Sequence, residues 1–238
     1  VNIYRGVTTG YNPAFIITDE QKDSLIAQDA RNKEVIKNML QGRNIRKWYY
    51  NESDENLLFL PWHFPLHEDM ELKGASEKAE SLFKEDFPAI YQHLLIHKKA
   101  LLDRNQEETG KRYEWYALQR CAASYYHEFE KNEKVIWGLT ANNWAFAYDD
   151  KQHYLPSNGY ILTSTDIPIR YLLGWLNSKL MPHYFHYIGV MTAGGAYTLK
   201  AATISALPFK IPEEYMAIEE KVDAILLVKN KDKQADTT

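Results

Sequence analysis

The sequence is poor in cysteine and has no long hydrophobic segment. Its single cysteine, Cys121, cannot form an internal disulfide framework, and a lone thiol fits a reducing compartment. No apolar run approaches the ~20 residues that a membrane-spanning helix needs, and no signal peptide opens the chain. We therefore expect a cytoplasmic protein without a membrane partner. Because the first residue is Val rather than Met, we also expect it to be part of a longer polypeptide.

The composition is that of a globular protein. The 238 residues are 45% hydrophobic and 25% charged, and a chain of this length can bury a sizeable core. A net charge of -4 argues against a generally basic nucleic-acid binder. The 17 tyrosines and six tryptophans suit either a recognition surface or a large aromatic core. Neither an internal repeat nor a low-complexity linker is present, which favours one α/β (α+β) domain with a mixed or antiparallel sheet flanked by helices.

Local patterns predict the elements of this domain. β-branched and aromatic runs predict strands at 2–9, 14–18, 57–62, 134–139, 144–148 and 159–163. Apolar residues at helical spacing and capping signals predict helices at about 19–29, 32–40, 87–104, 115–126, from 171 onward, and 212–229. The turn signal Gly10-Tyr11-Asn12-Pro13 favours a hairpin between the first two strands. Thr18 and Gln21 form a capping box for the first helix, and Gly42 is placed as a C-cap for the second.

Several motifs resemble catalytic or metal sites but lack the context that the chemistry needs. Asn12-Pro13-Ala14-Phe15 is similar to the loop that binds the target amino group in adenine methyltransferases, yet no βαβ unit with a glycine-rich turn accompanies it. Asp54 with Glu71-Leu72-Lys73 imitates a metal-dependent nuclease, but Glu71 lies in a polar, helix-prone stretch. His183 and His186 have no cysteine or carboxylate at ligand spacing. We therefore expect no catalytic residue and no metal site in this chain.

The distribution of charge points instead to nucleic-acid binding. Four cations and no acid lie between Lys37 and Trp48, and no carboxylate lies between Asp166 and Glu213. Lys111, Arg112 and Arg120 form a third, smaller basic cluster. The acids gather at 52–55, 68–86 and 213–220. A chain that segregates its charges in this way can present one basic face to a polyanion despite its negative net charge.

Four stretches resemble a known family, and they occur in the family's order. They are residues 5–17 (RGVTTGYNPAFII), 42–48 (GRNIRKW), 134–136 with 145–149, and 171–180 followed by 194–197 and 207–208. Together they resemble the TaqI-like C-terminal specificity domain, which follows the methyltransferase domain in type II and combined restriction-modification enzymes. The resemblance covers nearly the whole chain from Asn2 to Pro212. Asn44 stands where the family usually has Asp.

This resemblance implies a DNA target recognition domain over residues 1–211, followed by a C-terminal helix and frayed tail over 212–238. Such a domain reads double-stranded DNA in the major groove while a separate methyltransferase domain of the same polypeptide flips and methylates adenine. The chain itself would then be non-catalytic. S-adenosylmethionine, and Mg²⁺ if the parent is also an endonuclease, would bind to catalytic domains outside it.

The candidate DNA-binding residues follow from charge, loop position and hydrogen-bonding geometry. Arg suits guanine edges, Asn suits adenine edges, and Lys and backbone N–H groups suit phosphates. The candidates are Arg43, Arg46, Lys47, Lys111, Arg112, Arg120, Asn142, Asn143, Thr192, Tyr197 and Lys200. Within the acid-free stretch, we expect residues 192–200 to project as a loop whose Gly194-Gly195 lets the main chain approach phosphate. Two alternatives stay open: a carbohydrate-binding module that uses the aromatic residues, and a protein-interaction domain that uses the acidic helices.

Overall fold

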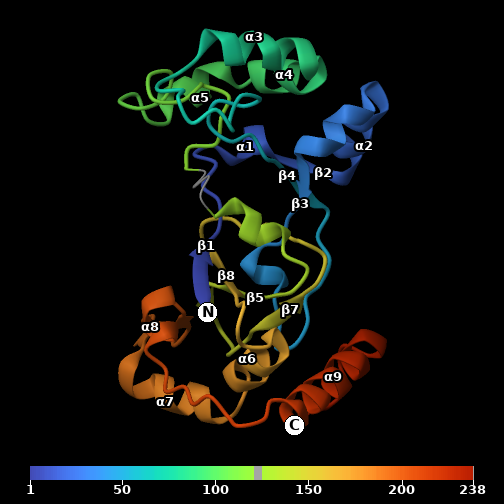
Figure 1. Ribbon diagram of the computed structural model, residues 1–238, viewed down its shortest axis with the longest axis vertical. Coiled ribbons are helices and arrows are strands. Elements are labelled where there is room, and N and C mark those ends of the chain that lie inside the picture. The colour runs from blue at the N-terminus through green and yellow to red at the C-terminus, as the bar shows by residue number, and fades with distance from the viewer. Residues whose placement is uncertain (121–124, 238) are drawn as a thin grey trace. The chain divides into compact units, whose positions relative to one another are not determined.

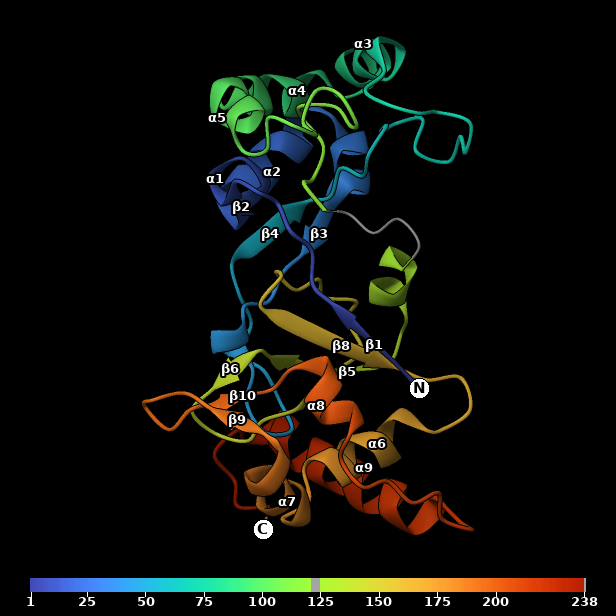
Figure 2. The same cartoon turned by 90° about the vertical axis from the view of Figure 1, so that its left-hand side faces the viewer.

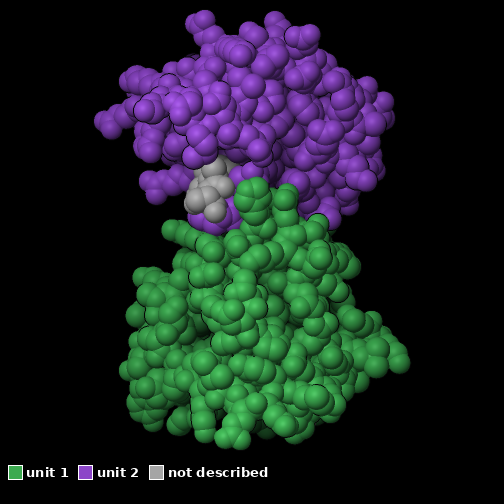
Figure 3. All heavy atoms as spheres, in the orientation of Figure 1, with its two compact units in different colours: residues 1–6, 40–53, 127–238 green, residues 7–39, 54–126 purple. Residues whose placement is uncertain are grey.

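The computed structural model describes residues 1–120 and 125–237, and the chain divides into two compact units. Unit 1 comprises residues 1–6, 40–53 and 127–238, and unit 2 comprises residues 7–39 and 54–126 (Figure 3). Both units mix helices with antiparallel strands, and a C-terminal helix ends the chain, so the expected α/β class is confirmed. Among the described residues, no helix is long and apolar enough to cross a membrane.

Unit 1 contains two sheets and four helices among its described residues (Figure 1). Its strands are β1 (Asn2–Arg5), β5 (Lys134–Gly138), β6 (Thr140–Ala141), β7 (Ala147–Asp149), β8 (Gly159–Thr163), β9 (Val190–Met191) and β10 (Tyr197–Thr198). Its helices are α6 (Ile169–Leu176), α7 (Leu180–Ile188), α8 (Ala201–Ser205) and α9 (Met216–Lys231). A short 3₁₀ turn, η2 (Gly42–Asn44), precedes the basic stretch, and another, η3 (Tyr126–Glu130), begins as the chain re-enters the unit.

The larger sheet of unit 1 has the antiparallel order β1-β8-β5-β7. Every residue of β5 and β8 is buried, which explains why these strands read as continuous apolar runs rather than alternating ones. Helices α6 to α9 cover one face of this sheet (Figure 2). Trp137 and Leu162 of the sheet share a core there with Leu173 of α6, Phe185 of α7 and Val222 of α9. This core is the scaffold on which the surface loops of unit 1 stand.

Helix α9 packs closely on α6 because α6 has a glycine at the contact. A Cβ atom on Gly174 would lie 2.8 Å from Cγ2 of Val222 and 3.1 Å from Cγ2 of Ile218. Arg170 adds a polar contact, since its guanidinium donates to Asp223 of α9 and to Glu133 before β5. The C-terminal helix is therefore held within unit 1, while the expected domain boundary at residue 212 stays a prediction.

A buried charge cluster lies beside the larger sheet. The Lys134 ammonium is fully buried and contacts Asp149 Oδ2 at 2.8 Å, and His153 Nδ1 lies 2.8 Å from Asp149 Oδ1. Burial alone would raise the pKa of Asp149, but the hydrogen bond from His153 and the charge of Lys134 outweigh it and lower that pKa to about 2. The carboxylate thus stays ionised and links β5 to the segment after β7.

The smaller sheet of unit 1 has the order β6-β10-β9 (Figure 2). Its register pairs Tyr197 with both Ala141 and Met191. Leu199 N donates to Leu139 O at 2.7 Å, which attaches this sheet to the end of β5. The strands contain only two residues each, so their main role is to fix the loops that follow β6 and β9.

Unit 2 places a small sheet against helices. Its strands are β2 (Ile16–Thr18), β3 (Ile36–Asn38) and β4 (Glu55–Leu58), in the antiparallel order β2-β4-β3. Its helices are α1 (Asn12–Phe15), α2 (Asp19–Gln28), α3 (Glu77–Asp86), α4 (Pro88–Leu95) and α5 (Lys98–Asp103), with the 3₁₀ turn η1 (Ala30–Val35) between α2 and β3. The expected capping box is confirmed: Thr18 Oγ1 accepts from Gln21 N, and Gln21 Oε1 accepts from Thr18 N.

The predicted N-terminal hairpin is wrong. β1 pairs with β8 in unit 1, whereas β2 pairs with β4 in unit 2. The turn signal between them instead forms α1, where Pro13 occupies the first turn and Thr9 Oγ1 donates to Asn12 Oδ1 at 2.6 Å. Local β propensity indicated strands correctly but could not name their partners, which are distant in sequence.

The predicted helix over residues 32–40 is also wrong. This segment forms η1 and then β3, because β4 supplies a strand partner for Ile36 and its neighbours. Gly42 does not cap that segment; it begins η2. The apolar spacing of Val35, Ile36, Met39 and Leu40 is compatible with either structure, and tertiary pairing decided between them.

Three further boundaries differ from the prediction. The helix expected over 87–104 is interrupted by a turn at residues 96–97, which divides it into α4 and α5; Leu94 and Leu101 are both fully buried. The expected helix over 115–126 is absent from residues 115–120, and residues 121–124, including Cys121, lie outside the described residues. The last helix begins at Met216 rather than at Pro212.

Candidate functional site

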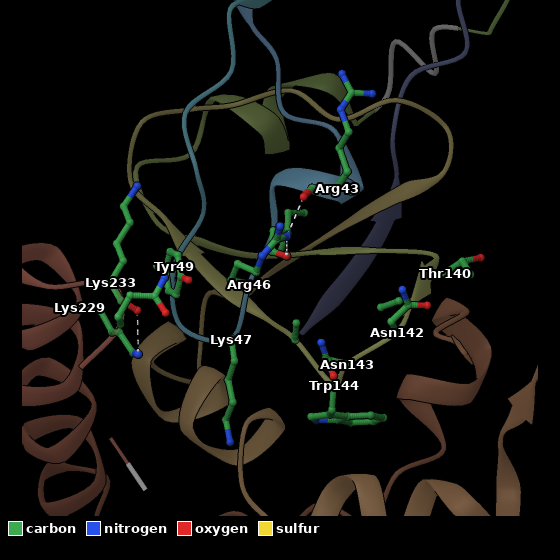
Figure 4. A pocket seen from close by; sticks show the side chains of 15 residues that line it. Arg43, Arg46, Lys47, Tyr49, Thr140, Asn142, Asn143, Trp144, Lys229 and Lys233 are labelled. Carbon is green, nitrogen blue, oxygen red and sulfur yellow. Dashed lines mark hydrogen bonds between the residues drawn. The ribbon is translucent and has the colours of Figure 1, made fainter. Parts of the chain in front are cut away.

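The most basic concave surface of unit 1 is a cavity of about 760 Å³, here called the basic hollow (Figure 4). The described residues that line it include five cations and no carboxylate. The cations are Arg43, Arg46, Lys47, Lys229 and Lys233. The neutral polar groups are Thr140, Asn142, Asn143 and Gln234, and two aromatic rings, Tyr49 and Trp144, complete the lining. Figure 4 shows the asparagines on one side, Lys229 and Lys233 on the other, and Arg46 and Lys47 between them.

A tight hairpin turn presents the central cations of the hollow. Ile45 and Tyr50 form an antiparallel bridge, and Arg46 N donates to Tyr49 O at 2.8 Å. Trp48 has a φ of 79°, an uncommon conformation for a bulky residue, and its ring is buried in the core. Trp48 N also donates to Phe146 O at 2.9 Å. Burial of the indole therefore anchors the turn while the neighbouring cations stay at the surface.

Two residues of the GRNIRKW stretch, Gly42 and Asn44, have structural roles in η2, just before this turn. Asn44 Oδ1 accepts from Gln41 N at 3.1 Å and closes η2, so an amide oxygen performs the capping that a carboxylate would perform at this position. Gly42 lies against Gly138 of β5, and a Cβ on Gly42 would be 3.3 Å from the Gly138 Cα. Both features fix η2 on the end of β5, where the hollow begins.

The electrostatics of the hollow favour an anion. Burial and the nearby positive charge of Lys179 both lower the pKa of Lys47, so a negative group between the two ammonium groups would relieve their repulsion. Arg46 Nη1 donates to the carbonyls of Arg43 and Ile45, at 2.6 Å and 2.9 Å. These bonds use one terminal nitrogen of the Arg46 guanidinium and hold the side chain in place.

The C-terminal segment contributes two cations that sequence reasoning missed. Lys229 Nζ and Lys233 Nζ lie 5.6 Å and 5.8 Å from the centre of the Tyr49 ring. Lys233 Nζ donates to Asn51 Oδ1, and Lys229 Nζ donates to the carbonyls of Lys233 and Ala235. The expected frayed tail is therefore held against the hollow as far as Ala235. The alternation of lysines at 229, 231 and 233 was the one available signal.

The two candidate asparagines lie in the loop between β6 and β7. Asn142 and Asn143 are exposed and line the hollow, whereas the adjacent Trp144 is buried. The Trp144 indole donates its Nε1 hydrogen to Leu176 O at 2.6 Å. The strand expected over 144–148 begins only at Ala147, because Trp144 is buried in the core and does not pair with a neighbouring strand among the described residues.

The candidates near the smaller sheet do not line the hollow. Thr192 is exposed at a turn, where its Oγ1 accepts from Ala196 N at 3.0 Å. The Tyr197 ring packs edge-on against Trp144 and Phe185, so it supports the core. Lys200 is exposed at the start of α8. A DNA contact by any of these three candidates stays a prediction.

The remaining candidates belong to unit 2 and have structural partners there. Arg112 Nη1 contacts Glu108 Oε1 at 3.0 Å, and its guanidinium lies 5.0 Å from the centre of the Trp62 ring. Arg120 is exposed and its backbone pairs with Thr8. Lys111 is exposed, and its carbonyl accepts from Ala75 N. The DNA contacts of these three residues also stay predictions.

Clusters of metal-ligating side chains and paired acids and histidines are the arrangements that metal or acid–base chemistry would need in the described residues. No group of three or more His, Cys, Asp or Glu side chains in that part of the chain could hold a metal ion. The most enclosed acid–histidine pair of unit 2 is structural: Glu114 accepts from His63 N and Ser76 N and lies 3.0 Å from His63 Nδ1. What the site offers is a set of cations and amides suited to binding.

Comparison with known proteins identifies relatives of the chain in both sequence and fold. The model of the TaqI-like C-terminal specificity domain matches residues 37–209. The type II methyltransferase M.MjaIV of Methanocaldococcus jannaschii is 26% identical over 230 residues, which cover 93% of this chain and 68% of that protein. The type IIL restriction-modification enzyme MmeI, solved in complex with DNA, shares the fold with a TM-score of 0.66 at 16% identity. That match covers 99% of this chain and 29% of MmeI, so the chain spans less than a third of MmeI.

Proposed function

Because the chain belongs to the family of TaqI-like C-terminal specificity domains, we propose that it recognises the DNA target of a restriction-modification enzyme through its basic hollow. The observation that carries this proposal is the lining of the hollow, with five cations and no carboxylate among its described residues. A chain with a net charge of -4 concentrates positive charge there despite its overall composition. The complex of the related fold MmeI with DNA supports the same partner, double-stranded DNA.

The arrangement of the hollow suits a duplex better than a small anion. Its cations come from the 43–47 turn and from the end of α9, on two sides of the cavity (Figure 4). Charges spread in this way can contact successive phosphates, while the asparagines, on the side of the cavity away from Lys229 and Lys233, can reach base edges. Phosphate contacts would supply affinity and register, and the amides would supply sequence discrimination.

We also propose that the chemistry is performed outside this chain, by a methyltransferase domain of the same polypeptide. All pairings between the described strands are antiparallel, so these residues do not form the parallel βαβ unit and glycine-rich turn that hold a nucleotide-like cofactor such as S-adenosylmethionine. The described residues likewise offer no cluster of ligands for a Mg²⁺ ion. In this proposal, the role of this chain is recognition, and the adenine target is delivered to a catalytic domain elsewhere.

A salt titration tests the proposal. The full polypeptide that contains this chain is titrated against fluorescent random duplex DNA at several salt concentrations between about 50 and 200 mM. We expect affinity to fall steeply with salt, because each neutralised phosphate contributes about 0.9 to the slope of log K against log salt. Binding that is absent, or independent of salt, would overturn the proposal.

A matched pair of variants then locates the surface. The double variant Arg46→Gln/Lys47→Gln removes two charges of the hollow and should lower the slope. The control Lys84→Gln removes an exposed charge of α3 in unit 2 and should leave the slope unchanged. An equal effect of the two changes would mean that the hollow is not the binding surface.

The structure weakens the case for a carbohydrate-binding module. Such a module presents exposed aromatic rings in a planar row, but none of the six tryptophans is exposed. The half-buried Trp62 stacks on Tyr113 at 4.7 Å, and Trp175 donates its Nε1 hydrogen to Pro208 O. The abundance of tryptophan reflects core packing in both units.

A further inference from the structure

Two side-chain amides of the basic hollow have no hydrogen-bond partner in the part of the chain that the structure describes. Asn142 and Asn143 are exposed, and neither side chain makes a hydrogen bond to any described residue. Asn44 and Asn177 of unit 1, in contrast, are engaged: Asn44 accepts from Gln41 N, and the Asn177 amide bonds in both directions with the backbone of Phe146. The hollow therefore contains two adjacent amides whose donors and acceptors are available to a ligand.

The loop that presents these amides is held at both ends. On one side, Thr140 and Ala141 pair with Thr198 and Tyr197 of β10. On the other side, Trp144 is buried and its indole bonds to Leu176 O at 2.6 Å. Only Asn142 and Asn143 lie between these anchors, so little loop entropy is lost when the amides bind.

The cationic neighbours do not offer the same chemistry. Arg46 is the central guanidinium of the hollow, and its Nη1 is committed to two backbone carbonyls. A lysine ammonium carries no acceptor and reads a phosphate as a point charge. Each asparagine of this loop has an amide donor and a carbonyl acceptor in one plane. This pattern matches the N6 amino group and N7 of adenine.

We propose that Asn142 and Asn143 read adenine in the major groove, and that the target sequence of this domain contains at least one A·T pair recognised by them. This inference rests on the proposed function and names the base that the basic hollow selects. Trp144 acts as a positioning residue, because its buried indole bonds to Leu176 O and fixes the loop. The cations of the hollow contact phosphates and set the register.

A binding selection from randomised duplexes tests the proposal with the full polypeptide. The selected sequences are compared for the unchanged protein, Asn142→Ala, Asn143→Ala and the double variant, with Asn158→Ala as the control. Asn158 is an exposed turn residue of unit 1 that does not line the hollow. We expect the double variant to lose the preference for adenine at one or two positions and to keep every other preference, while the control is unchanged.

The affinity of the double variant for the selected site should fall about 5- to 150-fold, which is the range for loss of a bidentate base contact. An unchanged adenine preference in the double variant overturns the proposal. Loss of preference at every position by a folded double variant also overturns it, because the asparagines would then act through general positioning. If the unchanged protein selects no sequence and binds no DNA, the proposed function itself fails, which is a different result.

A change on the DNA side avoids the risk that a variant misfolds. Replacing the adenine by 7-deazaadenine removes the N7 acceptor and should weaken binding by the unchanged protein about 2- to 12-fold, half the free energy of a bidentate pair. The Asn142→Ala/Asn143→Ala variant should bind both duplexes equally. An equal penalty for the two proteins would show that another group contacts N7 and would overturn the assignment.

Discussion

Both units combine cations with aromatic rings, but they use the cations differently. In unit 2, the Arg104 guanidinium lies inside and donates to the carbonyls of Thr9, Trp115 and Ala117 at 2.6 to 2.7 Å. Arg112 of the same unit is paired with Glu108. In unit 1, the cations of the basic hollow surround an open cavity whose described lining has no carboxylate. Arg104 and Arg112 of unit 2 therefore have partners within their own unit, whereas the cations of the basic hollow face an open cavity.

This difference shows that a cluster of charges in a sequence does not define an interface. The 111–120 and 43–47 stretches both place cations next to aromatic residues. They differ in their tertiary partners, which come from residues distant along the chain. The changes below are expected to separate the two uses of charge, through their effects on stability, on DNA binding, or on both.

The largest effect is expected from Arg104→Met in unit 2. Three backbone carbonyls would lose a charged donor in a half-buried setting, and an unsatisfied buried acceptor costs about 1 to 3 kcal/mol. We expect the free energy of unfolding of unit 2 to fall by about 3 to 5 kcal/mol in chemical denaturation.

The control for this change is Lys84→Met, which replaces an exposed cation of α3. It should alter the stability by less than about 0.5 kcal/mol. A loss of similar size for the two variants would contradict the structural role assigned to Arg104.

The next effect concerns the buried charge cluster of unit 1 and depends on pH. The pKa of Asp149 is lowered from 3.8 to about 2 in the folded state. A depressed carboxyl pKa contributes stability above the unfolded value, and this contribution is lost as pH falls from about 4 through about 2. The size of this shift corresponds to about 2 kcal/mol.

The measurement is the free energy of unfolding between pH 2 and pH 6, with Asp149→Asn as the comparison. The variant should be less stable above about pH 4, because the buried Lys134 loses its counter-charge, and the difference should narrow as the pH falls toward 2. It should also lack the part of the acid dependence that belongs to Asp149. Identical pH profiles for the two proteins would show that Asp149 does not titrate in this window.

Sequence patterns identified elements whose signals are local, and failed where a distant partner decides. The Thr18 capping box and the buried strands β5 and β8 are visible in the sequence because their determinants lie within a few residues. The 32–40 segment became 3₁₀ turn and strand because β4, about 20 residues later, pairs with it. Local propensity does not predict a pairing between strands that are distant in the sequence.

The same reason limits what the sequence reveals about the site. The 43–47 cations and the 142–143 asparagines were found from residue type, and the structure brings them into one cavity although almost 100 residues separate them. Lys229 and Lys233 were missed because only the packing of α9 on α6 brings the C-terminal segment to Tyr49. The sequence does not show that the Asn142 and Asn143 amides lack a hydrogen-bond partner among the described residues, or that the Arg46 guanidinium has one. Both facts depend on contacts that only the folded structure shows.

A smaller effect is expected from Arg112→Ala in unit 2, which sharpens the comparison with Arg46→Ala in unit 1. The ion pair with Glu108 and the contact with Trp62 together contribute about 1 kcal/mol to stability. We expect Arg112→Ala to lower stability by that amount with little change in DNA affinity. Arg46→Ala should lower DNA affinity instead. If Arg112→Ala weakens binding at one base position, Arg112 is a base-reading residue after all.

The smallest effect on stability, and the most direct test of the C-terminal contribution, is expected from Lys233→Gln. Lys233 is exposed at the basic hollow, where its ammonium lies above the Tyr49 ring, so its loss should change the free energy of unfolding by less than about 0.5 kcal/mol. If it contacts a phosphate, the slope of log K against log salt should become shallower by about 0.9, evenly for all DNA sequences. Lys221→Gln is the matched control, because Lys221 is an exposed lysine of α9 that does not line the hollow. Equal slopes for Lys233→Gln and Lys221→Gln would confine the DNA-binding surface to the 43–47 turn and the 142–143 loop.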